Sequence, residues 1–101
     1  MCSQQLGSAE SACDIDNELV RVTRWTFAPG AETGSHRHNY DYVICPVTNG
    51  RMRIDTDNES FIAELTAGVS YFRTGGNTHN VTNIGEGELI FVGTELLNRP
   101  A

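Results

Sequence analysis

The sequence has few basic residues. Lysine and arginine together number seven, against 13 aspartates and glutamates, so the formal net charge is −6 at pH 7. Nucleic acids and anionic membrane surfaces attract basic proteins through their phosphates, and this charge balance argues against both as partners. We therefore expect the partner to be a small molecule or another protein.

The chain also begins without the basic and apolar segments of a secretory signal peptide, and no apolar run is long enough to span a membrane. Its three cysteines, Cys2, Cys13 and Cys45, are odd in number and lack the spacing of a disulfide framework. Reduced thiols fit this pattern better than disulfides do. The sequence is therefore expected to belong to a cytoplasmic protein.

No segment has a helical period, and 101 residues are most simply one domain. Short stretches of β-branched and aromatic residues alternate instead with turn residues, which is typical of strands. The predicted strands cover residues 18–27, 40–47, 51–56, 60–66, 69–74, 78–84 and 89–97. This pattern predicts an all-β sandwich or small barrel.

Two further expectations concern the connections. Residues 1–17 are polar without periodicity, so we expect a flexible N-terminal arm before a domain of residues 18–101. Asn49-Gly50 is the strongest short hairpin signal and predicts that the strands on either side of it pair with each other. Trp25 and Phe27 are expected to pack the sandwich or a dimer interface, and Phe91 is expected to lie in the core.

Two of the three histidines, His36 and His38, stand one residue apart. Residues i and i+2 of a strand point to the same side, so both imidazoles would face one side and Arg37 the other. His79, on a strand brought across by the topology, would complete a triangular face. Neutral imidazole binds zinc, copper, iron and nickel, and three protein ligands leave coordination positions open, as in catalytic sites.

The glycines around these histidines resemble the two motifs of the cupin family. The first motif is G-x5-H-x-H-x3/4-E-x6-G, and the second is G-x5-P-x-G-x2-H-x3-N. The matching positions are Gly30, His36, His38 and, one position late, Gly50 for the first motif, and Gly68, Gly76, His79 and Asn83 for the second, with Thr74 in place of the proline. The resemblance implies a single-domain cupin jelly-roll barrel, a double-stranded β-helix.

The segment RWTFAPG and the Tyr-Asp-Tyr that follows the histidine pair are most similar to the small single-domain cupins associated with β-alanine degradation in bacteria. Tyr42 stands where cupins usually have a glutamate as the fourth metal ligand. Asp41 is an alternative ligand, but strand alternation points it outward unless a bulge redirects it. Three neutral imidazoles without a carboxylate would leave a divalent ion its full charge, which attracts an anionic substrate.

Tyr42 is the candidate catalytic residue. It would hydrogen-bond a ligand of the metal, act as an acid or base, or bind the ion as a phenolate, and the alternative is an aromatic that fills the barrel. Arg53 and Arg73 are candidate substrate-binding residues, because an arginine facing inward would bind a carboxylate, and Tyr71 shares the face of Arg73. The alternative for both arginines is a solvent-facing position. Asn83 is expected to hold backbone through its amide.

The resemblance implies a divalent metal ion, with Fe(II) favoured over Zn, Ni, Mn or Cu. The leading hypothesis is a metal-dependent enzyme of the dioxygenase type that acts on a small carboxylate-bearing metabolite. A metal-dependent lyase or isomerase, or a non-catalytic cupin that binds metal or metabolite, are the alternatives. Because cupins are commonly dimers, a homodimer is expected.

Overall fold

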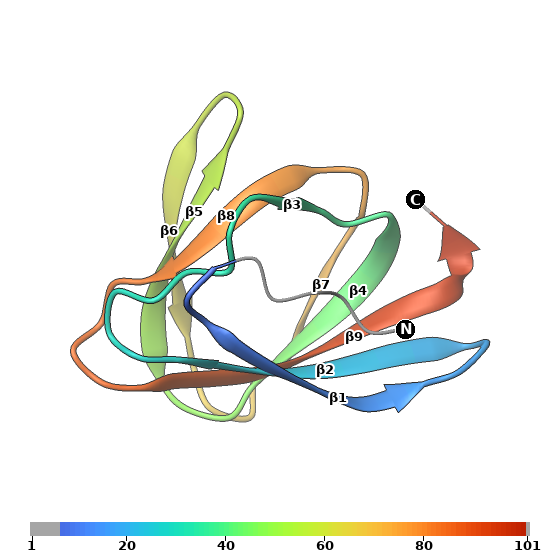
Figure 1. Cartoon of the computed structure of the whole chain (residues 1–101), viewed down its shortest axis with the longest axis horizontal. Helices are drawn as coiled ribbons and strands as arrows, with labels where there is room; N and C mark the ends of the chain where they lie inside the picture. Colours follow the sequence, from blue (N-terminus) through green and yellow to red (C-terminus); the bar gives the residue numbers. More distant parts are fainter. Residues whose placement is uncertain (1–6, 101) are drawn as a thin grey trace.

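The computed structural model describes residues 7–100 (Figure 1). Within these residues the chain forms strands and no helix. The described residues therefore contain no helix long and apolar enough to cross a membrane. The strands are β1 (Glu10–Asp16), β2 (Val20–Phe27), β3 (His36–Arg37), β4 (Tyr40–Pro46), β5 (Gly50–Thr56), β6 (Ser60–Leu65), β7 (Tyr71–Arg73), β8 (Thr78–Asn83) and β9 (Leu89–Pro100). The all-β prediction is confirmed.

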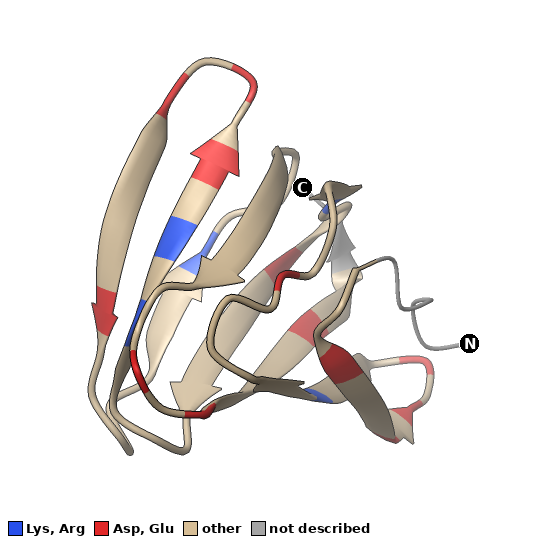
Figure 2. Ribbon diagram, turned by 60° about the vertical axis from the view of Figure 1, so that its left-hand side comes forward, with Lys and Arg blue, Asp and Glu red and all other residues tan. Residues whose placement is uncertain are grey.

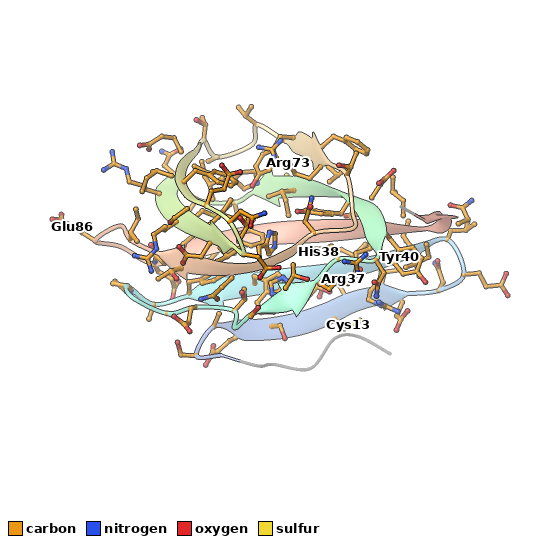
Figure 3. The ribbon with its side chains drawn as sticks, turned by 90° about the horizontal axis from the view of Figure 1, so that it is seen from above. Cys13, Arg37, His38, Tyr40, Arg73 and Glu86 are labelled. Atoms are coloured by element: carbon orange, nitrogen blue, oxygen red, sulfur yellow. The ribbon has the colours of Figure 1, made fainter. Side chains whose placement is uncertain are left out.

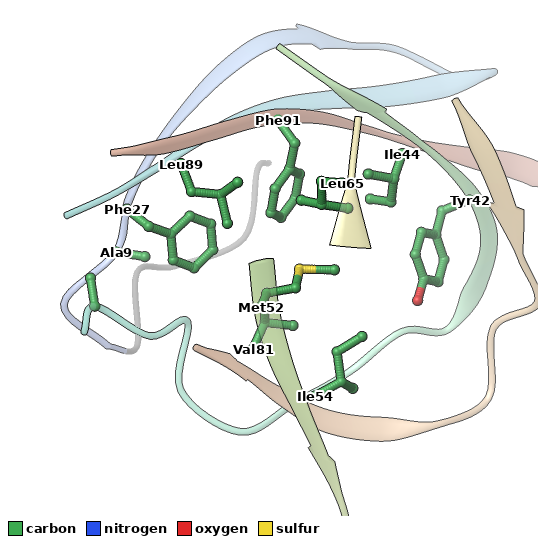
Figure 4. Close-up of a cluster of buried hydrophobic side chains, with 11 residues drawn as sticks. Ala9, Phe27, Tyr42, Ile44, Met52, Ile54, Leu65, Val81, Leu89 and Phe91 are labelled. Atoms are coloured by element: carbon green, nitrogen blue, oxygen red, sulfur yellow. The ribbon is translucent and has the colours of Figure 1, made fainter. Parts of the chain in front are cut away.

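The strands form two sheets. The larger has the order β1-β2-β9-β4-β7, and the smaller has the order β3-β8-β5-β6. Consecutive strands often lie in different sheets, so the chain passes back and forth between the two layers, as in a jelly roll (Figure 1). The side chains of the two inner faces meet between the sheets and form the core (Figure 4).

The predicted hairpin at Asn49-Gly50 is wrong. β4 pairs with β7 and β9, whereas β5 pairs with β6 and β8, so the chain changes sheets here. Gly50 gives room to the buried Leu89, because a Cβ at position 50 would lie 2.6 Å from the Cδ1 atom of Leu89 and would force that side chain to shift. The local Asn-Gly signal therefore marks a crossing of the barrel rather than a two-residue turn.

Part of the predicted N-terminal arm is a strand. β1 pairs with β2 at the edge of the larger sheet, with a register shift between Cys13 and Ile15. Most of its residues are exposed, so neither face imposes an alternating pattern on the sequence. Cys13 is disulfide-bonded, against the expectation of reduced thiols, while Cys45 is free. Residues 1–6 of the arm lie outside the described part of the chain.

One end of the barrel holds the most deeply buried large side chains. Phe27 and Leu89 pair across β2 and β9 and are 0% and 1% exposed, and Phe91 packs on Phe27 with ring centroids 5.4 Å apart (Figure 4). Asn83 is buried among them. Its amide donates to the carbonyls of Phe27 and Gly87, and its oxygen accepts the amide of Gly85. Asn83 thus holds three backbone groups, as expected.

The inner face of the larger sheet is arranged in rows, because paired residues on neighbouring strands point the same way. The row formed by Thr23, Gly93, Ile44 and Tyr71 crosses the middle of the sheet. On one side of it lie the aromatic residues Trp25 and Phe91. On the other side lies a polar row formed by Arg21, Glu95, Tyr42 and Arg73. The sheet therefore runs from an apolar end to a charged end.

Candidate metal centre

The three histidines converge at the polar end of the barrel. β3 pairs with β8 so that His36 lies directly opposite His79. His38 follows β3, where its amide donates to the carbonyl of Asn77 and its carbonyl accepts the amide of Gly76. Gly76 has a φ of 98°, which a residue with a Cβ rarely adopts, so the glycine allows this loop to close around His38. The predicted convergence of the histidines is confirmed.

The ring nitrogens of the three histidines lie close together. The Nε2 atom of His38 is 3.1 Å from the Nε2 atom of His36 and 3.1 Å from that of His79. His36 is held from behind, since its Nδ1 atom lies 2.8 Å from the carbonyl oxygen of Gly34. That hydrogen bond requires the proton to be on Nδ1 and leaves the Nε2 lone pair of His36 directed at the cluster.

Hydrogen bonding alone does not account for this cluster. With its proton on Nδ1, a neutral His36 has none on Nε2, so the proton between His36 and His38 must come from His38. The same Nε2 atom of His38 then has no lone pair to accept a proton from His79, and its single proton cannot form linear hydrogen bonds to both neighbours at once. Metal–nitrogen bonds of ~2.1 Å at right angles would place ligand nitrogens about 3 Å apart. The donor set and its spacing therefore fit a divalent cation.

Burial keeps the rings of His38 and His79 neutral. Burial, together with the neighbouring His79 and His36, lowers the pKa of His38 to about 3. Burial, together with His36, lowers the pKa of His79 to about 4. A neutral imidazole is the form that binds a metal, so both rings are ready to act as ligands at physiological pH.

These pKa values predict how the stability of the metal-free protein depends on pH. Unfolded histidine takes up a proton near pH 6.5, whereas folded His38 and His79 stay neutral down to about 3 and 4. Between pH 6.5 and about 4 the unfolded state therefore binds more protons than the folded state. The free energy of unfolding is highest above pH 6.5, where both states are neutral at these histidines, and it decreases as the pH falls. We expect urea midpoints to fall more steeply between pH 7 and 5 in the wild type than in a His38→Gln/His79→Gln variant. If the urea midpoints of the two proteins fall equally between pH 7 and 5, His38 and His79 are not the groups that stay neutral in the folded state.

Tyr42 lies beside the histidine cluster, on the facing sheet. Its ring stacks on that of His38, with centroids 4.2 Å apart and an interplanar angle of 23°, and the residue is 8% exposed. Burial raises the pKa of Tyr42 above its usual value, and the nearby Arg73 partly opposes this effect. The phenol is therefore protonated at neutral pH and can donate a hydrogen bond.

Tyr71 and Arg73 lie next to Tyr42 on the same wall. The guanidinium carbon of Arg73 is 4.4 Å from the centre of the Tyr71 ring, which is a cation–π contact. Burial raises the pKa of Tyr71 to about 12, with Arg73 opposing and Tyr42 adding to the shift. Both residues line a cavity of about 780 Å³ that also contains Tyr42 and the three histidines. Figure 3 shows Arg73 on the β7 side of the molecule and His38 nearer its middle.

Two of the predicted site residues lie elsewhere. Arg53 is on the outer face of β5, between the buried Met52 and Ile54, and its Nε atom donates to Asp55 at 3.1 Å. It does not line the cavity. The carboxylate of Asp41 accepts the backbone amide of Gly75 at 3.1 Å and is not part of the histidine group. The chain does have a register shift at this position, but Asp41 is directed at the neighbouring loop.

The sequence interpretation missed Arg21 and Glu95. Both line the cavity and are paired across β2 and β9, with 3.6 Å between Nη1 of Arg21 and Oε1 of Glu95. A local signal existed for each of them. Arg21 shares the inner face of β2 with Thr23, and Glu95 shares the inner face of β9 with Phe91, so alternation alone would place both charges inside.

The chain belongs to the cupin family, since residues 23–94 match the model of the cupin domain. The fold and the two histidine motifs described above are those expected from the resemblance. The jelly-roll prediction is confirmed by the similarity to solved cupin structures.

Among characterised relatives, the chain is 50% identical over 82 residues to the beta-alanine degradation protein BauB of Pseudomonas aeruginosa, covering 81% of this chain and 86% of BauB. A cupin domain protein of Bordetella pertussis has a similar structure, with a TM-score of 0.86, 45% identity and coverage of 93% of this chain and 98% of that one. The polyketide cyclase RemF of Streptomyces resistomycificus shares the fold at 17% identity, with a TM-score of 0.71 and coverage of 93% and 68%.

Proposed function

We propose that this cupin is a metal-dependent enzyme of the dioxygenase type that acts on a small carboxylate-bearing metabolite. The observation that carries the proposal is the convergence of three Nε2 atoms on the wall of a cavity, without a protein carboxylate among them. His36, His38 and His79 would hold the ion, with Fe(II) favoured and Zn, Ni, Mn or Cu as alternatives. Bound Fe(II) would supply a redox-active Lewis acid with open positions.

The surrounding residues of the chain would bind and orient the metabolite. Arg73 offers guanidinium donors for a carboxylate, and Tyr71 holds this guanidinium in place through its ring. The protonated phenol of Tyr42 would donate a hydrogen bond to the bound metabolite beside His38. The apolar residues Phe91 and Met52 line the far end of the cavity and would limit the access of water.

The name of the P. aeruginosa relative supports a metabolite from β-alanine breakdown, and we propose this context for the protein. We also propose a cytoplasmic homodimer. Ile62, on the outer face of β6, is 54% exposed and offers apolar surface to a second copy.

One observation favours a second reaction class. The ring of Tyr42 stacks on that of His38, beside the proposed ion, and this position suits a residue that exchanges a proton with a bound metabolite, as a metal-dependent lyase or isomerase would need. In that case turnover would need no oxygen. A cupin that only binds its ligand would show neither reaction.

Oxygen uptake by the Fe(II)-loaded protein tests the proposed function. We expect uptake that depends on one member of a panel of small carboxylic and amino acids. It should be absent from His79→Ala and about 100-fold slower in Tyr42→Phe, which lacks only the hydroxyl group. Product formation without oxygen uptake would overturn the dioxygenase reaction in favour of a lyase or isomerase. Metal and metabolite binding without any turnover would indicate a binding protein.

A further inference from the structure

The polar row on the inner wall carries opposite charges on the two sides of Tyr42. In the strand register, Tyr42 on β4 is opposite Arg73 on β7 on one side and Glu95 on β9 on the other. Neighbouring strands lie ~4.8 Å apart, so the backbones of Arg73 and Glu95 are separated by about 10 Å. Both side chains line the same cavity, so a cationic group and an anionic group face it from the two sides of Tyr42.

Glu95 lacks a hydrogen-bond donor among the described residues. Its side chain is 20% exposed, and its nearest cationic atom, Nη1 of Arg21, is 3.6 Å from Oε1, which is beyond hydrogen-bond distance. Arg21 also lies 3.7 Å from Asp16, so its charge is divided between two carboxylates. A mostly buried carboxylate normally accepts several hydrogen bonds. Glu95 therefore has acceptor capacity directed at the cavity.

Arg73 has the complementary property. Its Nη1 atom donates to the carbonyl of Phe72 at 3.0 Å, and its guanidinium lies over the ring of Tyr71. Among the described residues no carboxylate forms an ion pair with it. A guanidinium has five N–H donors, so Arg73 can still bind a carboxylate.

The charges of the whole cavity lining are balanced. Three arginines line it, Arg21, Arg37 and Arg73, and so do three acidic residues, Asp57, Glu59 and Glu95. Arg37 is already engaged with Asn39 and the carbonyl of Gly76. Asp57 and Glu59 lie in the loop between β5 and β6, which Figure 2 shows as an acidic tip. The protein part of the cavity thus has no excess of positive charge that would select a simple anion.

We propose that the metabolite bound here is a small amino acid with separate ammonium and carboxylate ends. The carboxylate binds Arg73, the ammonium group binds Glu95, and the short carbon chain crosses Tyr42. This inference rests on the proposed function, because it names the class of carboxylate-bearing metabolite that the same cavity takes. An acid without an amino group would leave Glu95 without a donor and would add a second negative charge near it.

Calorimetric titration with β-alanine and propionate tests this inference, because the two probes differ only by the amino group. Trp25, the single tryptophan, lines the cavity and provides a second readout by fluorescence. We expect β-alanine to bind roughly 10- to 100-fold more tightly than propionate, as for a hydrogen-bonded charged group. Glu95→Gln should abolish this preference by weakening β-alanine alone. Arg73→Gln should weaken both probes, and Glu64→Gln, on the outer face, should change neither.

Three results would overturn the inference: no binding of β-alanine at millimolar concentration, equal binding of the two probes by the wild type, or an equal loss of both in Glu95→Gln. The titrations are made on metal-free and on Zn(II)-loaded protein, and metal binding is measured on the same samples. Metal binding without a preference for β-alanine would refute the amino-acid inference and leave the metal site intact. A preference for β-alanine in a protein that binds no metal would support the inference and refute the proposed metal-dependent function.

Discussion

Replacement of His38 by alanine is expected to weaken the binding of a divalent metal by roughly 100-fold or more. Loss of a residue that only supports a metal ligand typically costs about 10- to 100-fold in affinity, and loss of a ligand itself should cost at least as much. The Nε2 atom of His38 lies 3.1 Å from the Nε2 atoms of both other histidines, so it is central to the cluster. Its loss would leave His36, whose Nδ1 atom is held by the carbonyl of Gly34, and His79 as the two remaining ligands. Competition with a chelator of known affinity would measure the change.

Arg51→Ala is the matched control for this experiment. Arg51 forms an exposed ion pair with Glu64 on the outer face of the smaller sheet, with 2.7 Å between Nε and Oε1. We expect its replacement to leave metal affinity unchanged. Loss of a ligand should change the metal affinity by more than about threefold. If the affinity of His38→Ala lies within about threefold of that of the wild type, the histidines are not the ligands.

Replacement of Phe27 by alanine is expected to lower the free energy of unfolding by about 3–5 kcal/mol. Phe27 is 0% exposed, and its ring packs against those of Trp25 and Phe91 at 6.2 and 5.4 Å between centroids. The carbonyl of Phe27 also accepts the buried amide of Asn83, so the surrounding backbone has little freedom to close the cavity left by the ring. Denaturant unfolding of metal-free protein would measure the loss.

Phe72→Ala is the control, since it removes the same side chain from an exposed position. Phe72 is 47% exposed on β7, and its replacement should cost less than about 1 kcal/mol, as for most surface substitutions. Similar losses in the two variants would contradict the placement of the core between the sheets at Phe27.

Most strands were predictable from the sequence because one face of each is buried. β5 shows this well, since the buried Met52 and Ile54 alternate with the exposed Arg51 and Arg53. β1 lacks such a face, so its sequence predicts a flexible arm rather than a strand. The pairing of β4 and β5 was predicted wrongly because Asn49-Gly50 is a local signal. The actual partners of β4 are distant in sequence and are selected by packing between the sheets.

Some features of the candidate site were also predictable from the sequence, and others were not. The convergence of His36, His38 and His79 was predictable from motif spacing, because the spacing determines which strand position each occupies. The row that joins Arg21, Glu95, Tyr42 and Arg73 depends on the order β2-β9-β4-β7, and no local pattern specifies that order. The outward position of Arg53 was predictable by alternation, since Met52 and Ile54 on either side of it are core residues.

The metal content of the protein, purified without a histidine tag or chelators, tests the central proposal most directly. Elemental analysis of the wild type should find about one divalent ion per chain, since three imidazoles form one site. A variant with His36, His38 and His79 all replaced by alanine should contain none. A wild type that takes up no metal even after reconstitution, or a triple variant that retains it, would contradict the assignment of this cluster as a metal centre.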